Sequence, residues 1–279
     1  MNNKISKSRL AAMNYYYRNY SFEYFLDSVS RNGLTQIELW TSPQHFWVED
    51  TGHQNVSQIK KNVADHNLKI ICLTPQQSNP NLYNLAAKSK HLRDGSIAYF
   101  KNLIDAAAEL GVHMIALNSG WDFYDEDPKK AWERSVEMMK IVAEYAASCQ
   151  IKIAVEALQP DESHLVNSIV DLKTYLDDVD ENNVGVNIDL GAMARNRETI
   201  LQYFTAFGSK VIHCHFVDGN PVGHRCWGEG ERNPGDDFQA FNSNNYQGDF
   251  TFEFGQSEYF LNPAAVERKS LAFLSPFLK

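Results

Sequence analysis

Short apolar runs alternate along this chain with longer segments in which apolar residues recur at about every third or fourth position, the period of an amphipathic helix. Strands that alternate with helices in this way pair in parallel. Eight such units in about 250 residues favour an α/β fold of the (β/α)8 or TIM-barrel type over a doubly wound sheet, which has fewer strands. The eight runs that read as strands are residues 9–15, 36–40, 68–74, 112–118, 151–157, 184–190, 210–217 and 249–255.

Polar residues within these runs fall on one face of each predicted strand. In the run 184–190, Val186 and Ile188 share one face, whereas Asp189 lies on the other. The same alternation places Glu156 and Glu253 opposite the apolar faces of their own runs. Helices cover the outside of a barrel, so the apolar faces point outward and the acids inward. Each acid stands at or near the last position of its strand, the end where barrel enzymes place their chemistry.

The run 210–217 carries two histidines, His213 and His215, which alternate with Ile212 and Cys214 and therefore share the inward face. His215 is level with the three acids. Three carboxylates around one point repel each other unless a cation lies among them. The alternative is that one or two of these acids form ordinary ion pairs in the core. The last four strands thus offer one set of candidate metal ligands: Glu156, Asp189, His215 and Glu253.

One imidazole and three carboxylates suit a hard or borderline divalent ion better than they suit a closed structural zinc site. We expect Mn²⁺ in the first place, with Co²⁺, Mg²⁺, Ni²⁺ or Zn²⁺ as alternatives. His213 lies one step deeper along its strand than His215. We expect it to face the substrate or to support a ligand without binding the ion itself.

Further candidates for substrate contact stand at strand ends and in the loops that follow. Glu38 lies on the inward face of the run 36–40, where it either lines the site or pairs with a buried base. His45 follows in the next loop, which is also an ordinary place for a surface histidine. Glu162 lies in the loop after the fifth strand, where it either hydrogen-bonds a polyol or is solvated. Trp121 is one of several aromatic residues expected either to form the apolar wall of a sugar pocket or simply to pack.

Composition narrows the class of protein and its partners. The formal net charge of -9 disfavours a nucleic acid or an acidic membrane as a partner. The four cysteines are scattered without a CxxC pair, which argues against a thiolate zinc site and a disulfide framework and fits the reducing cytoplasm. No signal-peptide pattern, membrane-spanning stretch, linker or repeat interrupts the chain. We therefore expect a cytoplasmic protein with one domain over residues 1–279.

The motifs IELW, LTP, VEALQPDES, VNIDLG, HCHFVDG, WGEG and FEFG occur in this order over nearly the whole chain. Together they resemble the xylose-isomerase-like barrels of sugar isomerases and epimerases, and most closely the fructoselysine 3-epimerase branch, near the tagatose and psicose 3-epimerases. The resemblance implies that the four candidate ligands bind one divalent metal and that Glu156 and Glu253 also move the proton. It further implies that Glu162 contacts the substrate and that the protein forms a dimer or larger homo-oligomer. The expected activity is that of an isomerase that inverts carbon 3 of a small sugar or sugar-amine through a metal-bound enediolate.

Two departures from the ketose 3-epimerases bear on the substrate. Ala192 stands where those enzymes usually have a histidine, and residues 219–221 lack their arginine. The resemblance to the fructosamine branch, which shares these absences, implies that His224 contacts the substrate instead. A fructosamine-type substrate such as fructoselysine or psicoselysine is therefore favoured over a free hexulose.

Other functions use the same barrel. A hydroxypyruvate or ketose isomerase, or an inosose dehydratase, would use the same ion and carboxylates. An endonuclease acting on abasic DNA sites would need several metals, more histidines and a basic groove, which the acidic charge disfavours. A non-catalytic sugar-binding barrel would keep the fold and lose the ion.

Overall fold

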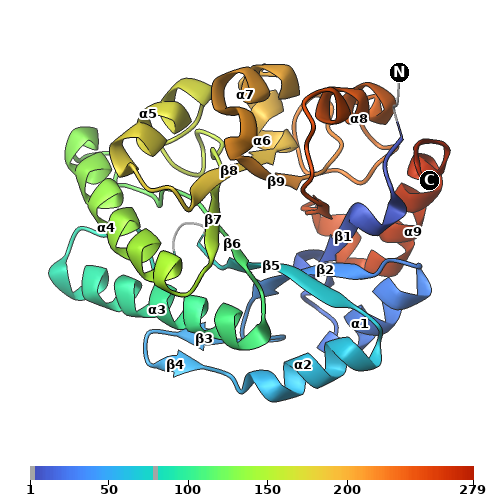
Figure 1. Cartoon of the computed structure of the whole chain (residues 1–279), viewed down its shortest axis with the longest axis horizontal. Coiled ribbons are helices and arrows are strands. Elements are labelled where there is room, and N and C mark those ends of the chain that lie inside the picture. The colour runs from blue at the N-terminus through green and yellow to red at the C-terminus, as the bar shows by residue number, and fades with distance from the viewer. Residues whose placement is uncertain (1–3, 78–80) are drawn as a thin grey trace.

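The structure is a computed structural model that describes residues 4–77 and 81–279. Within these residues eight parallel strands close into a barrel in the order β1, β10, β9, β8, β7, β6, β5, β2 (Figure 1). The eight predicted strands and the TIM-barrel class are confirmed. The barrel strands are Leu10–Met13 (β1), Gln36–Thr41 (β2), Lys69–Pro75 (β5), Met114–Leu117 (β6), Lys152–Val155 (β7), Val184–Asp189 (β8), Val211–His215 (β9) and Phe250–Phe252 (β10).

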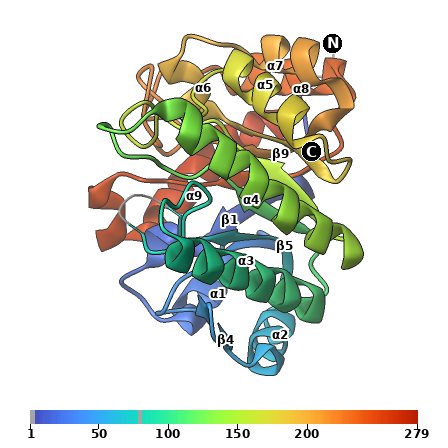
Figure 2. The same cartoon turned by 90° about the vertical axis from the view of Figure 1, so that its left-hand side faces the viewer.

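Helices surround the barrel on its outside, as Figures 1 and 2 show from two directions. A small antiparallel hairpin, Val48–Glu49 (β3) with Gly52–His53 (β4), follows β2 in the chain. The helices are Phe22–Arg31 (α1), Val56–Asp65 (α2), Lys90–Leu110 (α3), Pro128–Ser148 (α4), Ile169–Val179 (α5), Leu190–Arg195 (α6), Ile200–Phe207 (α7), Pro234–Ser243 (α8) and Pro263–Leu274 (α9). None of the helices in the described ranges is both long and apolar enough to cross a membrane.

Local sequence sets where these helices begin and end. Ser21 caps α1 by accepting a hydrogen bond from the backbone of Tyr24. Ser168 and Asp171 form a reciprocal capping box at the start of α5. Gly111 ends α3 with a left-handed φ of 76°, a conformation that glycine adopts without steric cost.

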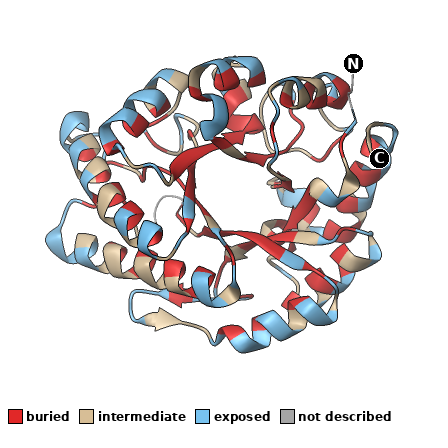
Figure 3. Cartoon of the chain, viewed as in Figure 1, coloured by how far each residue is buried: buried red, intermediate tan, exposed pale blue. Residues whose placement is uncertain are grey.

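The barrel strands are buried on both faces over most of their length, whereas most helices bury one side and expose the other (Figure 3). Outward residues of β8, such as Val186 and Ile188, pack in the layer between strands and helices. Aromatic rings fill the same layer behind β9 and β10, where the rings of Phe216 and Phe238 stack with centroids 4.9 Å apart. This packed layer holds the strand ends, and the polar groups on them, in fixed positions.

Two register shifts change which residues of neighbouring barrel strands lie opposite each other. Between Val186 and Asn187 the pairing of β8 with β9 shifts, so that Asp189 lies opposite His215. Between Ile37 and Glu38 the pairing of β2 with β5 also shifts, so that Glu38 lies opposite Cys72. Such irregularities change where the side chains after them point, and here they affect strands that carry charged inward groups.

Candidate metal centre and active site

The four groups predicted to converge do lie together at the carboxyl ends of neighbouring strands. Glu156 follows β7, Asp189 and His215 end β8 and β9, and Glu253 follows β10. One donor atom from each lies within 4.8 Å of the donor atoms of the other three. His215 Nδ1 is 2.9 Å from Glu253 Oε2, 3.1 Å from Glu156 Oε2 and 3.7 Å from Asp189 Oδ2.

The electrostatics of this cluster favour positive charge at its centre. Burial raises the pKa of Glu156 to about 7, against the attraction of His215. Burial alone would lower the pKa of His215, but Glu253, Glu38 and Glu156 raise it well above its ordinary value. Three carboxylates and one imidazole nitrogen in so small a volume fit a divalent cation, whose charge offsets the mutual repulsion of the acids.

Asp189 is held by a histidine from a loop far along the chain. His224 Nε2 lies 3.0 Å from Asp189 Oδ2, and the backbone N–H of Ala192 donates to Asp189 Oδ1 at the start of α6. Burial opposes ionisation of Asp189, but His224 and His215 outweigh it and hold its pKa below the ordinary range. His224 reaches this place because Gly191 has no side chain: a Cβ there would lie 2.6 Å from the imidazole ring.

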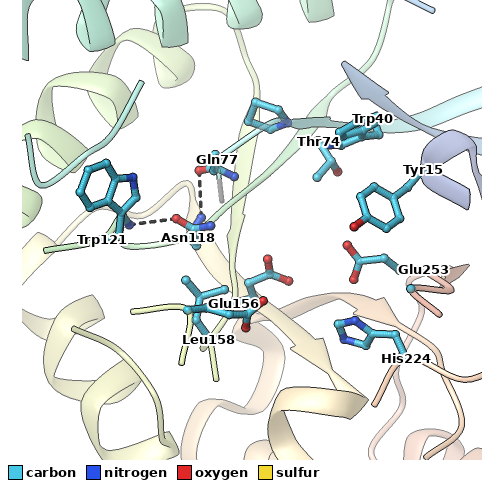
Figure 4. Close-up of a pocket in the computed structure, with 14 residues that line it drawn as sticks. Tyr15, Trp40, Thr74, Gln77, Asn118, Trp121, Glu156, Leu158, His224 and Glu253 are labelled. Carbon is cyan, nitrogen blue, oxygen red and sulfur yellow. Dashed lines mark hydrogen bonds between the residues drawn. The ribbon is translucent and has the colours of Figure 1, made fainter. Parts of the chain in front are cut away.

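A cavity of about 180 Å³ opens above the cluster, and Figure 4 shows the side chains around it. Of the predicted substrate contacts, Glu162, His224 and Trp121 line it. Burial raises the pKa of Glu162, which also accepts a hydrogen bond from the backbone of Gln159. The lining residues are Tyr15, Trp40, Thr74, Pro75, Gln77, Asn118, Gly120, Trp121, Glu156, Leu158, Glu162, His224, Glu253 and Gly255.

Glu38 and His213 are not among the cavity-lining residues; both are fully buried beneath the cluster. Glu38 Oε2 lies 2.7 Å from His213 Nε2, and Glu38 Oε1 lies 3.1 Å from His215 Nε2. Thr74 also donates to Glu38 Oε1. Burial raises the pKa of Glu38, but the two histidines more than reverse this and keep it well below its ordinary value. Of the two readings open for Glu38, the structure therefore shows the pairing with buried bases.

His45 is also absent from the cavity wall, and it is a buried residue rather than a surface one, with 3% exposure. Its Nε2 lies 2.8 Å from the carbonyl oxygen of Tyr20, and its Nδ1 lies 2.8 Å from Asn14 Nδ2. Asn14 in turn bonds the backbone N–H and carbonyl of Trp40, which does line the cavity. His45 thus supports the wall through Asn14.

The glycine-rich turn after β9 folds around a carboxylate of the chain itself. Asp218 accepts hydrogen bonds from the backbone N–H groups of Gly219, Gly228, Gly230 and Arg232. Glycines at 228 and 230 permit this close approach, since a side chain at Gly230 would collide with Asp218. These hydrogen bonds therefore hold together the two ends of the loop that carries His224.

Sequence reasoning missed part of the cavity wall. Gln77 and Asn118 line it, and the backbone N–H of Asn118 donates to Gln77 Oε1. Asn118 is the last residue of the predicted strand 112–118, so its position at a strand end was a usable signal. Gln77 comes from a loop, where no periodicity indicates which side chains turn inward.

Comparisons with known proteins agree with the resemblance found in the motifs. The fructoselysine 3-epimerase of Shigella flexneri is 28% identical over 211 residues, which cover 75% of this chain and 76% of that protein. The D-psicose 3-epimerase of Ruminiclostridium cellulolyticum is 29% identical over 204 residues, covering 71% and 67%. These relatives are named as epimerases, a class of sugar-acting isomerases.

The fold has close structural neighbours. The crystal structure of D-psicose 3-epimerase with D-tagatose from Clostridium cellulolyticum superposes with a TM-score of 0.77 at 21% identity, covering 97% of this chain and 99% of that one. A family model described as xylose isomerase-like TIM barrel matches residues 26–277. This chain therefore belongs to the xylose isomerase-like TIM barrel family.

Proposed function

We propose that this protein is a divalent-metal-dependent sugar epimerase that inverts carbon 3 of a ketose or of a fructosamine-type derivative. The observation that carries the proposal is the position of Glu156 and Glu253. Both line one cavity, and both belong to the same cluster as Asp189 and His215. The names of the relatives, fructoselysine and psicose 3-epimerases, support the same reaction.

Inversion of one carbon requires a base on one face of the substrate and an acid on the other. Glu156 extends from the end of β7 and Glu253 from the end of β10, with β8 and β9 between them, so they enter the cavity from different directions (Figure 4). One glutamate removes the proton from carbon 3, and the bonding electrons form an enediolate across carbons 2 and 3. The other glutamate returns a proton to the opposite face. A positioned carboxylate contributes about 10²- to 10⁴-fold to such a step.

The remaining groups hold charge and substrate in place. A divalent ion, Mn²⁺ in our proposal, supplies Lewis-acid stabilisation of the negative charge that develops on the sugar oxygens. Asp189 and His215 complete its ligand set, and His224 keeps Asp189 oriented. His224 and Glu162 also face the cavity, where they hydrogen-bond sugar hydroxyl groups.

The preferred substrate in this proposal carries an amine-linked substituent. Trp121 forms part of the cavity wall and also borders an apolar groove of about 470 Å³. Leu82, Leu92 and Phe123 line this groove and give an alkyl chain a surface to pack on. We further propose that the protein acts in the cytoplasm, as one domain over residues 1–279 and as a homo-oligomer.

The test is hydrogen exchange at carbon 3. The protein is stripped of metal, reloaded with Mn²⁺ and incubated in heavy water with fructose, psicose, tagatose and fructoselysine in turn. We expect deuterium at carbon 3, fastest with fructoselysine, and no exchange by the stripped protein. The variants E156Q and E253Q are expected to lose at least about 100-fold of the exchange rate.

Two controls make the result interpretable. Bound metal is measured in each variant, so that loss of the ion is separated from loss of a proton carrier. E267Q changes another buried glutamate, which lies on α9 outside the barrel, and should exchange like the wild type (Figure 1). Wild-type exchange rates in both E156Q and E253Q would contradict the assignment of the two glutamates.

A further inference from the structure

A buried polar layer lies directly beneath His215, on the side away from the cavity. It consists of Glu38 from β2 and His213 from β9, both 0% exposed. Thr74 from β5, which is 7% exposed and lines the cavity, donates a hydrogen bond to Glu38. The register shift at Glu38 brings this carboxylate level with residues of β5 and beneath the strand ends. Burying a carboxylate is costly unless its oxygens are hydrogen-bonded, so the partners of Glu38 show what this group does here.

The hydrogen bonds of this layer fix which nitrogen of His215 carries a proton. A carboxylate only accepts, so the imidazole nitrogen that lies 3.1 Å from Glu38 Oε1 must donate, and this nitrogen is Nε2. Nδ1 is then the nitrogen whose lone pair can bind a cation, and Asn187 Nδ2 lies 3.1 Å from it. It faces Glu253 Oε2 at 2.9 Å and Glu156 Oε2 at 3.1 Å, inside the candidate ligand set.

Glu38 is itself held in one orientation. His213 Nε2 lies 2.7 Å from its other oxygen, Oε2, and Thr74 donates to Oε1. Backbone contacts complete the arrangement, because the N–H of His215 donates to Asn187 Oδ1. The imidazole of His215 therefore has little freedom to rotate or to change tautomer.

We propose that Glu38 is a positioning residue for the candidate cation site: it holds His215 in the tautomer with the proton on Nε2 and turns Nδ1 toward the ion. The inference rests on the proposed function only through the presence of that ion. His213 and Thr74 are the supports that keep Glu38 in place. No residue of this layer is required to touch the sugar.

The donor atoms of Glu38, Cys72 and His213 also lie close enough together to suggest a second metal site. The contacts argue against that alternative. Both oxygens of Glu38 and the Nε2 of His213 already form hydrogen bonds with each other or with His215 and Thr74. The thiol of Cys72 donates to the carbonyl oxygen of Leu73, with the sulfur 3.6 Å from that oxygen.

The first test needs no variant. Protein with ¹⁵N-labelled histidine is loaded with Zn²⁺, which is diamagnetic, and the ring nitrogens of His215 are assigned by NMR. We expect a proton on Nε2 that exchanges slowly with water, and a metal-bound Nδ1 without a proton. A proton on Nδ1, or coordination through Nε2, would overturn the proposal.

The second test is metal affinity. The amide of E38Q has a single accepting oxygen and an NH₂ group, so it cannot accept from both His213 and His215. We expect the dissociation constant for Mn²⁺, measured by calorimetry on the stripped protein, to rise about 10- to 100-fold. The matched control is E267Q, the same exchange at a fully buried carboxylate that also has three side-chain donors, from Tyr16, Tyr17 and Asn32.

Neither measurement uses a sugar, so the two proposals fail separately. Wild-type affinity and an unchanged His215 tautomer in E38Q would overturn the positioning role even if the enzyme epimerises sugars. Conversely, a wild-type protein that binds Mn²⁺ through Nδ1 but exchanges no hydrogen at carbon 3 would refute the proposed reaction and leave the positioning role standing.

Discussion

The buried glutamate on α9 gives a quantitative prediction about stability. Glu267 is fully buried, and its carboxylate accepts hydrogen bonds from the hydroxyl groups of Tyr16 and Tyr17 and from the amide of Asn32. Burial raises its pKa to about 7 from an ordinary value of 4.5, because these donors offset only part of the cost of burying the charge. The folded protein therefore binds the proton more tightly than the unfolded chain does.

The sign of the pH effect follows from this difference. Below pH 4.5 the group is protonated in both states and has no effect on the pH dependence of stability. Between pH 4.5 and about 7 the unfolded chain has lost the proton and the folded protein has kept it, so the free energy of unfolding falls as the pH rises. At about 1.4 kcal/mol for each pKa unit, the full loss is about 3 kcal/mol.

The substitution E267Q removes this loss. Its amide is neutral at every pH, accepts from Asn32 and donates to a tyrosine hydroxyl, much as the protonated acid does. We expect the variant to match the wild type near pH 5 and to exceed its free energy of unfolding by about 3 kcal/mol at pH 8.

The assay is urea unfolding of both proteins in the presence of a chelator, at four values of pH between 5 and 8. The chelator removes the separate effect of metal binding, and the difference between the two proteins cancels the other titrating groups. A difference that does not change with pH would show that Glu267 is already ionised in the folded protein, and the argument from burial would be refuted.

Two further changes probe the loop that carries His224. G191A places a Cβ where the imidazole of His224 now lies, so we expect kcat/KM for exchange at carbon 3 to fall about 10-fold or more while urea unfolding changes little. D218A leaves backbone N–H groups such as that of Gly228 without their acceptor, and we expect the free energy of unfolding to fall by about 2–4 kcal/mol, measured by urea titration. An unchanged kcat/KM in the first variant, or an unchanged stability in the second, would contradict the roles assigned to these contacts.

The sequence predicted the barrel and the meeting of four polar groups, but not how deep each inward side chain lies. Alternation identifies the face on which a residue such as Glu156 or His215 lies, and the closure of a barrel then brings strand ends to a common level. Alternation also places Glu38 and His213 on the inward faces of their strands, yet both lie beneath the cavity. How far each side chain lies below the cavity depends on where its strand ends and on the register shift at Glu38. The pattern of apolar residues predicts neither of these.

Loop residues were harder to place because their positions depend on contacts distant in the chain. His45 was predicted as a substrate contact, yet its hydrogen bonds to Asn14 and Tyr20 direct it into the protein. His224 was predicted from the family resemblance, and it does lie at the cavity. Its ring contacts Asp189 at the end of β8 and occupies the space that a side chain at position 191 would fill. No local signal in either loop distinguishes these outcomes.

The two halves of the barrel supply different kinds of group, and the hydrogen bonds of His215 connect them. Strands β7 to β10 end in the candidate ligands, whereas β2 provides Glu38 beneath them and β5 provides Thr74, which lines the cavity and donates to Glu38. One imidazole faces three carboxylates through Nδ1 and a fourth, Glu38, through Nε2. Because the fourth carboxylate is buried and fully hydrogen-bonded, it cannot move to accommodate another arrangement of the ring without losing several contacts at once. A substitution in the buried layer, such as E38Q, should therefore weaken metal binding in a protein that remains folded.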